Sequence, residues 1–80
     1  MNLLLHLQIF VRVVDSGSFS RAAEHMGMAA SSVTASVQKL ERDLGTRLLQ
    51  RTTRRVRPTA EGEQLYEVAM LLLADAEETQ

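Results

Sequence analysis

The 80-residue sequence contains no cysteine, no tryptophan and a single proline, and its only aromatic residues are one tyrosine and two phenylalanines. The absence of cysteine excludes disulfides, thiolate metal sites and a cysteine nucleophile. A chain of this length forms at most one small domain, which buries only roughly 60% of the surface that the unfolded chain exposes. Such a marginal core predicts reliance on a second copy, a partner or a larger domain.

Long apolar runs are also missing. His6, Gln8 and Arg12 interrupt the apolar start of the chain, which has no basic leading region and is not followed by a small-residue cleavage site. We therefore expect no secretory signal at this position. No segment is long and apolar enough to cross a membrane. Together with the lack of cysteine, this predicts a cytoplasmic location and no membrane partner.

Residues suited to catalysis are sparse. The only histidines, His6 and His25, fall on different predicted helices without acidic residues at ligand spacing, and no glycine-rich phosphate loop occurs. Glu61 and Glu63 suit the positive start of a helix better than acid–base work. The sequence therefore predicts no enzyme, no metal site and no cofactor, with a two-histidine metal site as the minor alternative.

Charge is distributed unevenly along the chain although the formal net charge is only −1. Residues 39–57 hold seven basic and two acidic side chains, whereas residues 59–80 hold six acidic and no basic ones. A phosphate backbone would meet the basic segment locally, whatever the average. Charge alone fits an ordinary solvated surface of mixed sign equally well.

Three predicted helices are separated by glycines, which accept the left-handed conformation that ends a helix. The first runs from an N-cap at Asn2 to about residue 16, and the second, capped by Ser18, is short and ends at Gly27. The third spans residues 30–44 and starts poorly, because Ala29 cannot cap it. Apolar residues recur at helical spacing along its inner face: Val33, Val37, Leu40 and Leu44.

The opposite face of the third helix is polar, with small residues near its start. Two helices joined by a tight glycine turn, the second with such a face, form the helix-turn-helix pattern. The second helix fits the DNA major groove, where its early residues meet base edges. A three-helix bundle with a Ser/Thr surface is the alternative. The expected groove-facing start includes Ala30 and Ser36, and the predicted DNA contacts are Ser31, Ser32, Thr34, Ala35, Gln38, Lys39 and Arg42.

An arginine-rich hairpin is predicted directly after this helix. Residues 48–51 and 55–57 have the composition of two short exposed strands, and Pro58 closes the hairpin. Arginine suits phosphates and a narrow minor groove. A basic hairpin after a helix-turn-helix is a more specific signal than either part alone. The predicted contacts on this wing are Arg51, Thr53, Arg54 and Arg55.

A last helix is predicted from Ala60 to Thr79. Its broad apolar face cannot stay exposed in a soluble monomer, which predicts a homodimer. A helical dimerisation or adaptor module without DNA binding is the competing class, but such a module has no need of the basic hairpin. Met26 and Met70 are expected in the core. The predicted dimer contacts are Leu65, Ala69, Leu72, Leu73 and Ala76.

Residues 7–62 resemble the N-terminal domain of LysR-type transcriptional regulators. The strongest stretch is LERDLGTRLLQRTTRRVRPTAEG, residues 40–62, whose RTTR is similar to the wing of one large subgroup. The sequence departs from the family where Ala29, Ala30, Ala35 and Ser36 replace residues that are usually larger or more polar, and where Leu49 replaces a phenylalanine. Further matching positions are Phe10, Gly17-Ser18-Phe19, Ala22-Ala23, Ser31 and Val33.

The resemblance implies an all-α domain with a small β-hairpin. Residues 1–58 would form a winged helix-turn-helix, with the helix at 30–44 in the major groove and the wing at 48–57 on the minor groove or phosphates. Residues 59–80 would form a linker helix that pairs with its mate in a homodimer, and tetramers are common in full-length members. The resemblance also implies a small-molecule effector, sensed by a larger domain outside these 80 residues.

Overall fold

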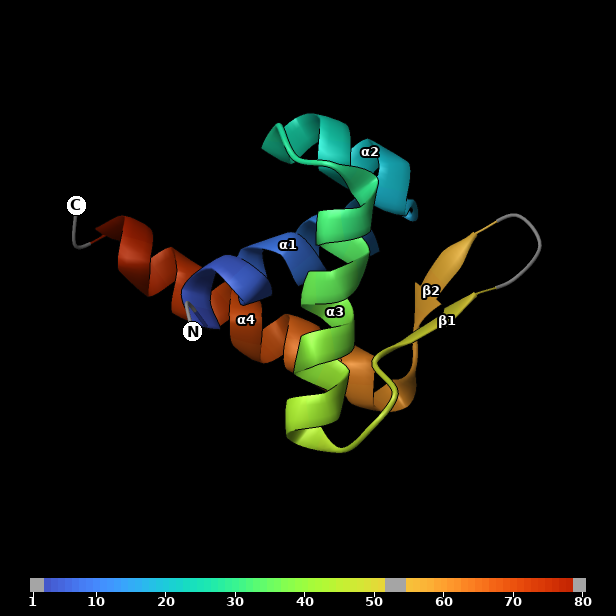
Figure 1. Cartoon of the computed structure of the whole chain (residues 1–80). Helices are drawn as coiled ribbons and strands as arrows, with labels where there is room; N and C mark the ends of the chain where they lie inside the picture. The colour runs from blue at the N-terminus through green and yellow to red at the C-terminus, as the bar shows by residue number, and fades with distance from the viewer. Residues whose placement is uncertain (1–2, 52–54, 79–80) are drawn as a thin grey trace.

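Four helices and one antiparallel hairpin form the structure, a computed structural model that describes residues 3–51 and 55–78, with side chains up to residue 74 (Figure 1). The expected all-α fold with a small hairpin is confirmed. The Asn2 cap and the helix end at Thr79 lie outside the described residues. The elements are α1 (Leu3–Ser16), α2 (Phe19–Met26), α3 (Ala30–Leu44), β1 (Leu49–Arg51), β2 (Val56–Pro58) and α4 (Ala60–Glu78).

The helix ends follow the local chemistry of the sequence. Ser18 caps α2, because its hydroxyl accepts a hydrogen bond from the Arg21 N–H at 3.2 Å. At the end of α3, Gly45 has a φ of +68°, and its N–H bonds to the Glu41 carbonyl. Ala29 makes no side-chain cap at the start of α3, as the sequence predicted.

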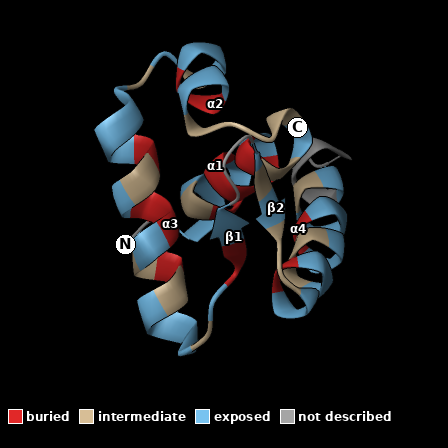
Figure 2. Ribbon diagram, turned by 90° about the vertical axis from the view of Figure 1, so that its right-hand side faces the viewer, coloured by how far each residue is buried: buried red, intermediate tan, exposed pale blue. Residues whose placement is uncertain are grey.

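The main core lies where α1, α2 and α3 meet around the fully buried Phe10 (Figure 2). The small Ala22 and Ala23 of α2 and the fully buried Val33 of α3 belong to this core. Two expectations about the core are wrong. Leu44 is 54% exposed at the end of α3, and Met70 lies on the exposed side of α4, whereas Met26 does pack against the core.

A second apolar cluster joins α4 to α1. Leu7 and Val11 of α1 enclose Ala69, which is fully buried, and Leu65 and Leu73 pack at the edge of the cluster. α4 therefore packs directly on α1, and it lies beside α1 in Figure 1. The division of the chain at residue 59 remains a prediction.

The hairpin strands differ slightly from the expected ranges. The register pairs Leu49 with Pro58 and Arg51 with Val56, so Leu48 and Arg55 lie outside the ladder and Pro58 lies inside it. Leu48 is excluded because its N–H donates to the Glu41 side chain. Pro58 is tolerated because the strand is at an edge, where its missing N–H breaks no ladder bond. The two strands extend away from the helices (Figure 1).

A hydrogen bond between a phenol and a carboxylate links α4 to α1, and its strength depends on pH. The Tyr66 hydroxyl donates to Asp15 Oδ1 at 2.6 Å. This hydrogen bond, together with desolvation and the charge of Asp15, raises the pKa of Tyr66 above its ordinary 10.0. The raised pKa means that the contact stabilises the fold while the phenol is protonated, and that this contribution is lost as the pH rises through the folded-state pKa.

Tyr66→Phe should therefore flatten the alkaline part of the stability profile. At neutral pH the variant should be less stable by only about 0.5–1 kcal/mol, because the bond is exposed to solvent. Above pH 10 the wild-type chain should lose stability more steeply than the variant. Urea unfolding over a pH series measures this, with Asp15→Asn as a control that keeps the acceptor oxygen. Parallel profiles for wild type and Tyr66→Phe would contradict the assignment.

Candidate nucleic-acid interface

The outer face of α3 is polar and open. Ser31, Ala35, Gln38 and Arg42 are all exposed and lie opposite the buried stripe, as a rotation of about 100° per residue requires (Figure 2). Alanine and serine at the start of this face leave the helix backbone accessible. Gln38 and Arg42 place longer polar side chains one and two turns further along. Four of the seven predicted α3 residues thus form the centre of the face.

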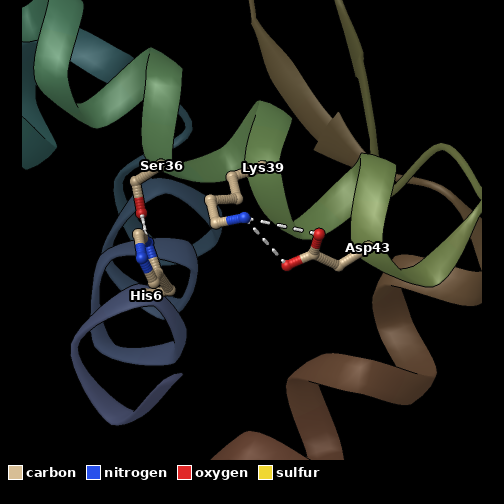
Figure 3. Close-up of polar contacts among 4 residues, drawn as sticks. All are labelled: His6, Ser36, Lys39 and Asp43. Atoms are coloured by element: carbon tan, nitrogen blue, oxygen red, sulfur yellow. Dashed lines mark hydrogen bonds and ion pairs between the residues drawn. The ribbon is translucent and has the colours of Figure 1, made fainter. Parts of the chain in front are cut away.

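The other three predicted α3 residues lie at its flanks. Ser32 is exposed, and Lys39 approaches Asp43 at 3.5 Å in an exposed pair along the helix (Figure 3). Such pairs contribute little, so Lys39 keeps most of its freedom to contact another anion. The Thr34 hydroxyl donates to the Ala30 carbonyl at 3.0 Å, which leaves its methyl group and the oxygen lone pairs for a ligand.

Ser36 does not face outward, contrary to expectation. Only 5% of it is exposed, and its hydroxyl shares a hydrogen bond with His6 Nδ1 of α1 (Figure 3). Ser36 lies on the inner side of α3, beside Val33 and Leu40. A polar side chain in this position is expected to be exposed. The pattern along α3 does not reveal that Ser36 has a buried hydrogen-bond partner, because that partner lies 30 residues earlier in the chain.

The wing presents arginines along both strands. Arg51 is exposed, and its guanidinium lies 4.6 Å from the centre of the Phe19 ring, a cation–π arrangement that ties the wing to the start of α2. Arg55 and Arg57 are exposed as well. Arg57, which belongs to the predicted basic segment but not to the predicted contacts, pairs with Gln50 in the hairpin. The predicted contacts Thr53 and Arg54 lie outside the described residues.

A groove of about 310 Å³ separates α3 from the wing. Arg47 and Arg51 give it positive charge. The groove also contains one carboxylate, that of Glu41. Its Oε2 accepts hydrogen bonds from the Leu48 N–H at 2.8 Å and the Leu49 N–H at 3.3 Å. Sequence patterns did not single out Arg47, and they noted Glu41 only for its charge and as a position that matches the family. The groove is lined by Phe19, Thr34, Val37, Gln38, Glu41, Arg47, Leu49 and Arg51.

The apolar face that α4 leaves open differs from the predicted dimer contacts. Ala69 is buried and Leu65 and Leu73 are partly buried against their own domain, because α1 supplies Leu7 and Val11 to cover them. Ala69 in particular has no surface left for a partner. The side chain of Ala76 lies outside the described part. Of the predicted set, Leu72 is exposed, and it is joined on this face by Val68 and Leu71.

Within residues 3–51 and 55–78, no three histidine, cysteine or acidic side chains are grouped as a metal site would need. In the same part of the chain, none of the helices has the length and apolarity to cross a membrane.

Comparison with known proteins places the chain in a family. The family model for bacterial regulatory helix-turn-helix proteins of the lysR family matches residues 4–63. The probable transcriptional regulator LtrA of Klebsiella pneumoniae is 47% identical over 76 residues, and CrgA of Neisseria meningitidis is 51% identical over 69 residues. These matches cover 95% and 86% of the chain, which spans about a quarter of the length of either relative, 25% and 23%.

Solved structures agree with the sequence comparison. The DNA-binding domain of BenM in complex with catB site 1 DNA superposes with a TM-score of 0.92 at 38% identity, covering 95% of this chain and 84% of that one. The CbnR DNA-binding domain in its DNA complex gives 0.89 at 32% identity, covering 95% and 87%. The chain therefore belongs to the LysR family of bacterial regulatory helix-turn-helix proteins, whose winged helix-turn-helix DNA-binding domain it comprises.

Proposed function

We propose that this chain binds double-stranded DNA sequence-specifically in transcription regulation, with α3 in the major groove and the hairpin on the minor groove or flanking phosphates. The observation that carries the proposal is the open polar face of α3 beside an arginine-bearing hairpin. The BenM and CbnR domains, which share the fold, are described in complex with DNA. We propose that this role is binding and not catalysis, and that the chain acts in the cytoplasm.

The side chains of α3 should contribute unequally to the recognition of bases, because they differ in length. Ser31 and Ala35 are short and make at most single hydroxyl or methyl contacts with base edges. Gln38 and Arg42 are long enough for paired hydrogen bonds to adenine and guanine, respectively, or to phosphates. Much of the sequence preference should therefore arise from the middle of the helix and from groove shape sensed by the wing arginines.

Arg51→Ala tests the role of the wing. Arg51 should act mainly through phosphates or groove shape, so the variant should bind all sequences more weakly by a similar factor. Removal of one phosphate contact should reduce the slope of log affinity against log salt by roughly 0.9. Affinity measured over a salt series with specific and random duplexes gives both quantities. Full affinity and an unchanged slope would remove the wing from the proposed interface.

We also propose that the chain acts as a homodimer, paired through the exposed face of α4 around Val68, Leu71 and Leu72. An apolar helix face of this size is rarely left uncovered. Tetramers and a small-molecule effector remain proposals for the whole regulator. An adaptor that only dimerises would pair in the same way but would show no salt-dependent retention on DNA, so retention on immobilised duplex DNA separates the two functions.

A further inference from the structure

The root of the wing, residues 47–49, is held from two sides, by Glu41 of α3 and by Thr59, the residue that precedes α4. From α3, the Glu41 carboxylate accepts the N–H groups of Leu48 and Leu49 at 2.8 and 3.3 Å. From the start of α4, the Thr59 hydroxyl donates to the Arg47 carbonyl at 2.6 Å, and the Thr59 N–H donates to the Leu48 carbonyl at 3.0 Å. Four hydrogen bonds thus clamp three consecutive residues.

The two clamping residues are themselves anchored at helix ends. Glu41 belongs to the last turn of α3, where its carbonyl also accepts the N–H groups of Gly45 and Thr46. Thr59 caps α4, since its hydroxyl accepts the Gly62 N–H at 3.0 Å. The Thr59 side chain cannot move without uncapping α4, and the backbone that carries the Glu41 side chain is fixed in the last turn of α3. The wing root, whose Leu48 and Leu49 are buried in the main core, therefore has one position relative to α3.

We infer that Glu41 and Thr59 are positioning residues for DNA binding, which set the place of the wing arginines relative to the reading face of α3. This inference rests on the proposed function. Arg51 is only two residues beyond the clamped segment, so a shift of the root moves its guanidinium together with the strand. A phosphate contact depends on the position of that group within a few tenths of an ångström, because a charge-assisted hydrogen bond has a narrow range of lengths.

Glu41 has a second effect through its charge. The carboxylate lies in the lining of the groove between α3 and the wing, near Arg47 and Arg51. A negative group beside a DNA backbone opposes binding, so its presence there needs a reason, and the two backbone N–H groups that it satisfies supply one. The amide of glutamine retains an acceptor oxygen without the charge and should hold the root while removing the repulsion.

The test compares Glu41→Ala and Thr59→Val, each of which removes one side chain of the clamp, with Glu41→Gln and Thr59→Ser, which keep an acceptor or a hydroxyl. Val11→Ala, in the separate α1–α4 cluster, serves as a control for general destabilisation. Duplex affinity is measured over a salt series in the wild-type and Arg51→Ala backgrounds, and amide hydrogen exchange is followed at Leu48 and Leu49. If Glu41→Ala does not fold, Thr59→Val alone carries the comparison.

Removal of the clamp should speed exchange at Leu48 and Leu49 at least about tenfold and lower the salt slope by the equivalent of one phosphate group, roughly 0.9. In the Arg51→Ala background the slope should fall no further, because the arginine that makes this interaction is already absent. The Gln and Ser variants should keep the wild-type slope, with the affinity of Glu41→Gln at or above that of wild type.

An unchanged slope in Glu41→Ala and Thr59→Val, an additive reduction in the Arg51→Ala background, or an equal reduction in Val11→Ala would overturn the inference. Failure of the proposed function looks different, since the wild-type chain itself would then show no salt-dependent affinity for DNA.

Discussion

Gly62→Ala is expected to destabilise the fold by about 1–3 kcal/mol, although the same change inside an exposed helix usually stabilises by up to about 1 kcal/mol. A Cβ at this position would lie 2.0 Å from the Leu48 carbonyl oxygen and 3.0 Å from its carbon. Both atoms belong to the backbone and cannot rotate away, so either α4 or the wing root must move. Steric overlap therefore outweighs the gain in helix propensity.

Urea unfolding gives the sign of this effect, and amide chemical shifts in the hairpin report whether the wing root has moved. Gly45→Ala is the matched control. Its Cβ would meet no atom within 4 Å, so its cost comes only from the positive φ, about 1–2 kcal/mol, and the hairpin should stay in place. A more stable Gly62→Ala chain with unshifted hairpin signals would show that α4 and the wing are less tightly joined than the structure indicates.

Leu71→Asp is expected to yield monomers and to lower the affinity for a two-half-site duplex by about 10²–10⁴-fold, the range gained when a second binding event becomes intramolecular. Leu71 is 70% exposed in the single chain, so the fold itself should lose little stability. An aspartate buried between two copies would instead lack a charged partner and prevent pairing. Leu72→Asp should act in the same direction.

Sedimentation measures the pairing, and a single-half-site duplex provides the matching DNA control, because affinity for it should change little. Leu44→Asp replaces an exposed leucine at the far end of α3 and should leave the dimer intact. A Leu71→Asp chain that still sediments as a dimer would rule out the α4 face as the interface.

The helix ends were predictable because their determinants are local. Ser18 and Gly45 act on the backbone within a few residues, and the apolar stripe of α3 repeats at the helical period through Val33 and Leu40. Composition predicted the hairpin and the last helix, and the family resemblance added the expectation that the hairpin is the wing of a winged helix-turn-helix. The same reasoning placed Ser31, Ala35, Gln38 and Arg42 on the outer face.

The structure differs from the expectations where the deciding partner is distant in the sequence. Ser36 was expected on the exposed face of α3. The pattern of that helix could not show its hydrogen-bond partner, His6, which lies on another helix. Ala69 was predicted to contact the second copy of the dimer. In the structure Leu7 and Val11 of the same chain, about 60 residues earlier, bury it, and the pattern of α4 alone does not reveal them. Periodicity shows that a helix has an apolar side, but it does not show which neighbour covers that side.

The strand boundaries failed for a related reason. The extent of β1 depends on whether Leu48 gives its N–H to a strand or to another group, and that choice is made by Glu41, seven residues earlier on α3. The pattern of alternating residues does not show whether the Leu48 N–H bonds to the opposite strand or to a side chain. Glu41 and Thr59 were for the same reason not recognised as organisers of the wing.

The hairpin has a consequence for how the protein remains in solution. It is a sheet of two short strands, so each strand has one edge without a neighbour in the described chain, and such edges invite strands of other molecules to pair with them. Arg51 and Arg57 lie on these strands and are exposed, and their like charges oppose the edge-to-edge pairing of one hairpin with another. The arginines proposed to meet phosphates thus also protect against aggregation. An engineer who replaced them with β-branched apolar residues to reduce DNA affinity would make the chain prone to associate edge to edge.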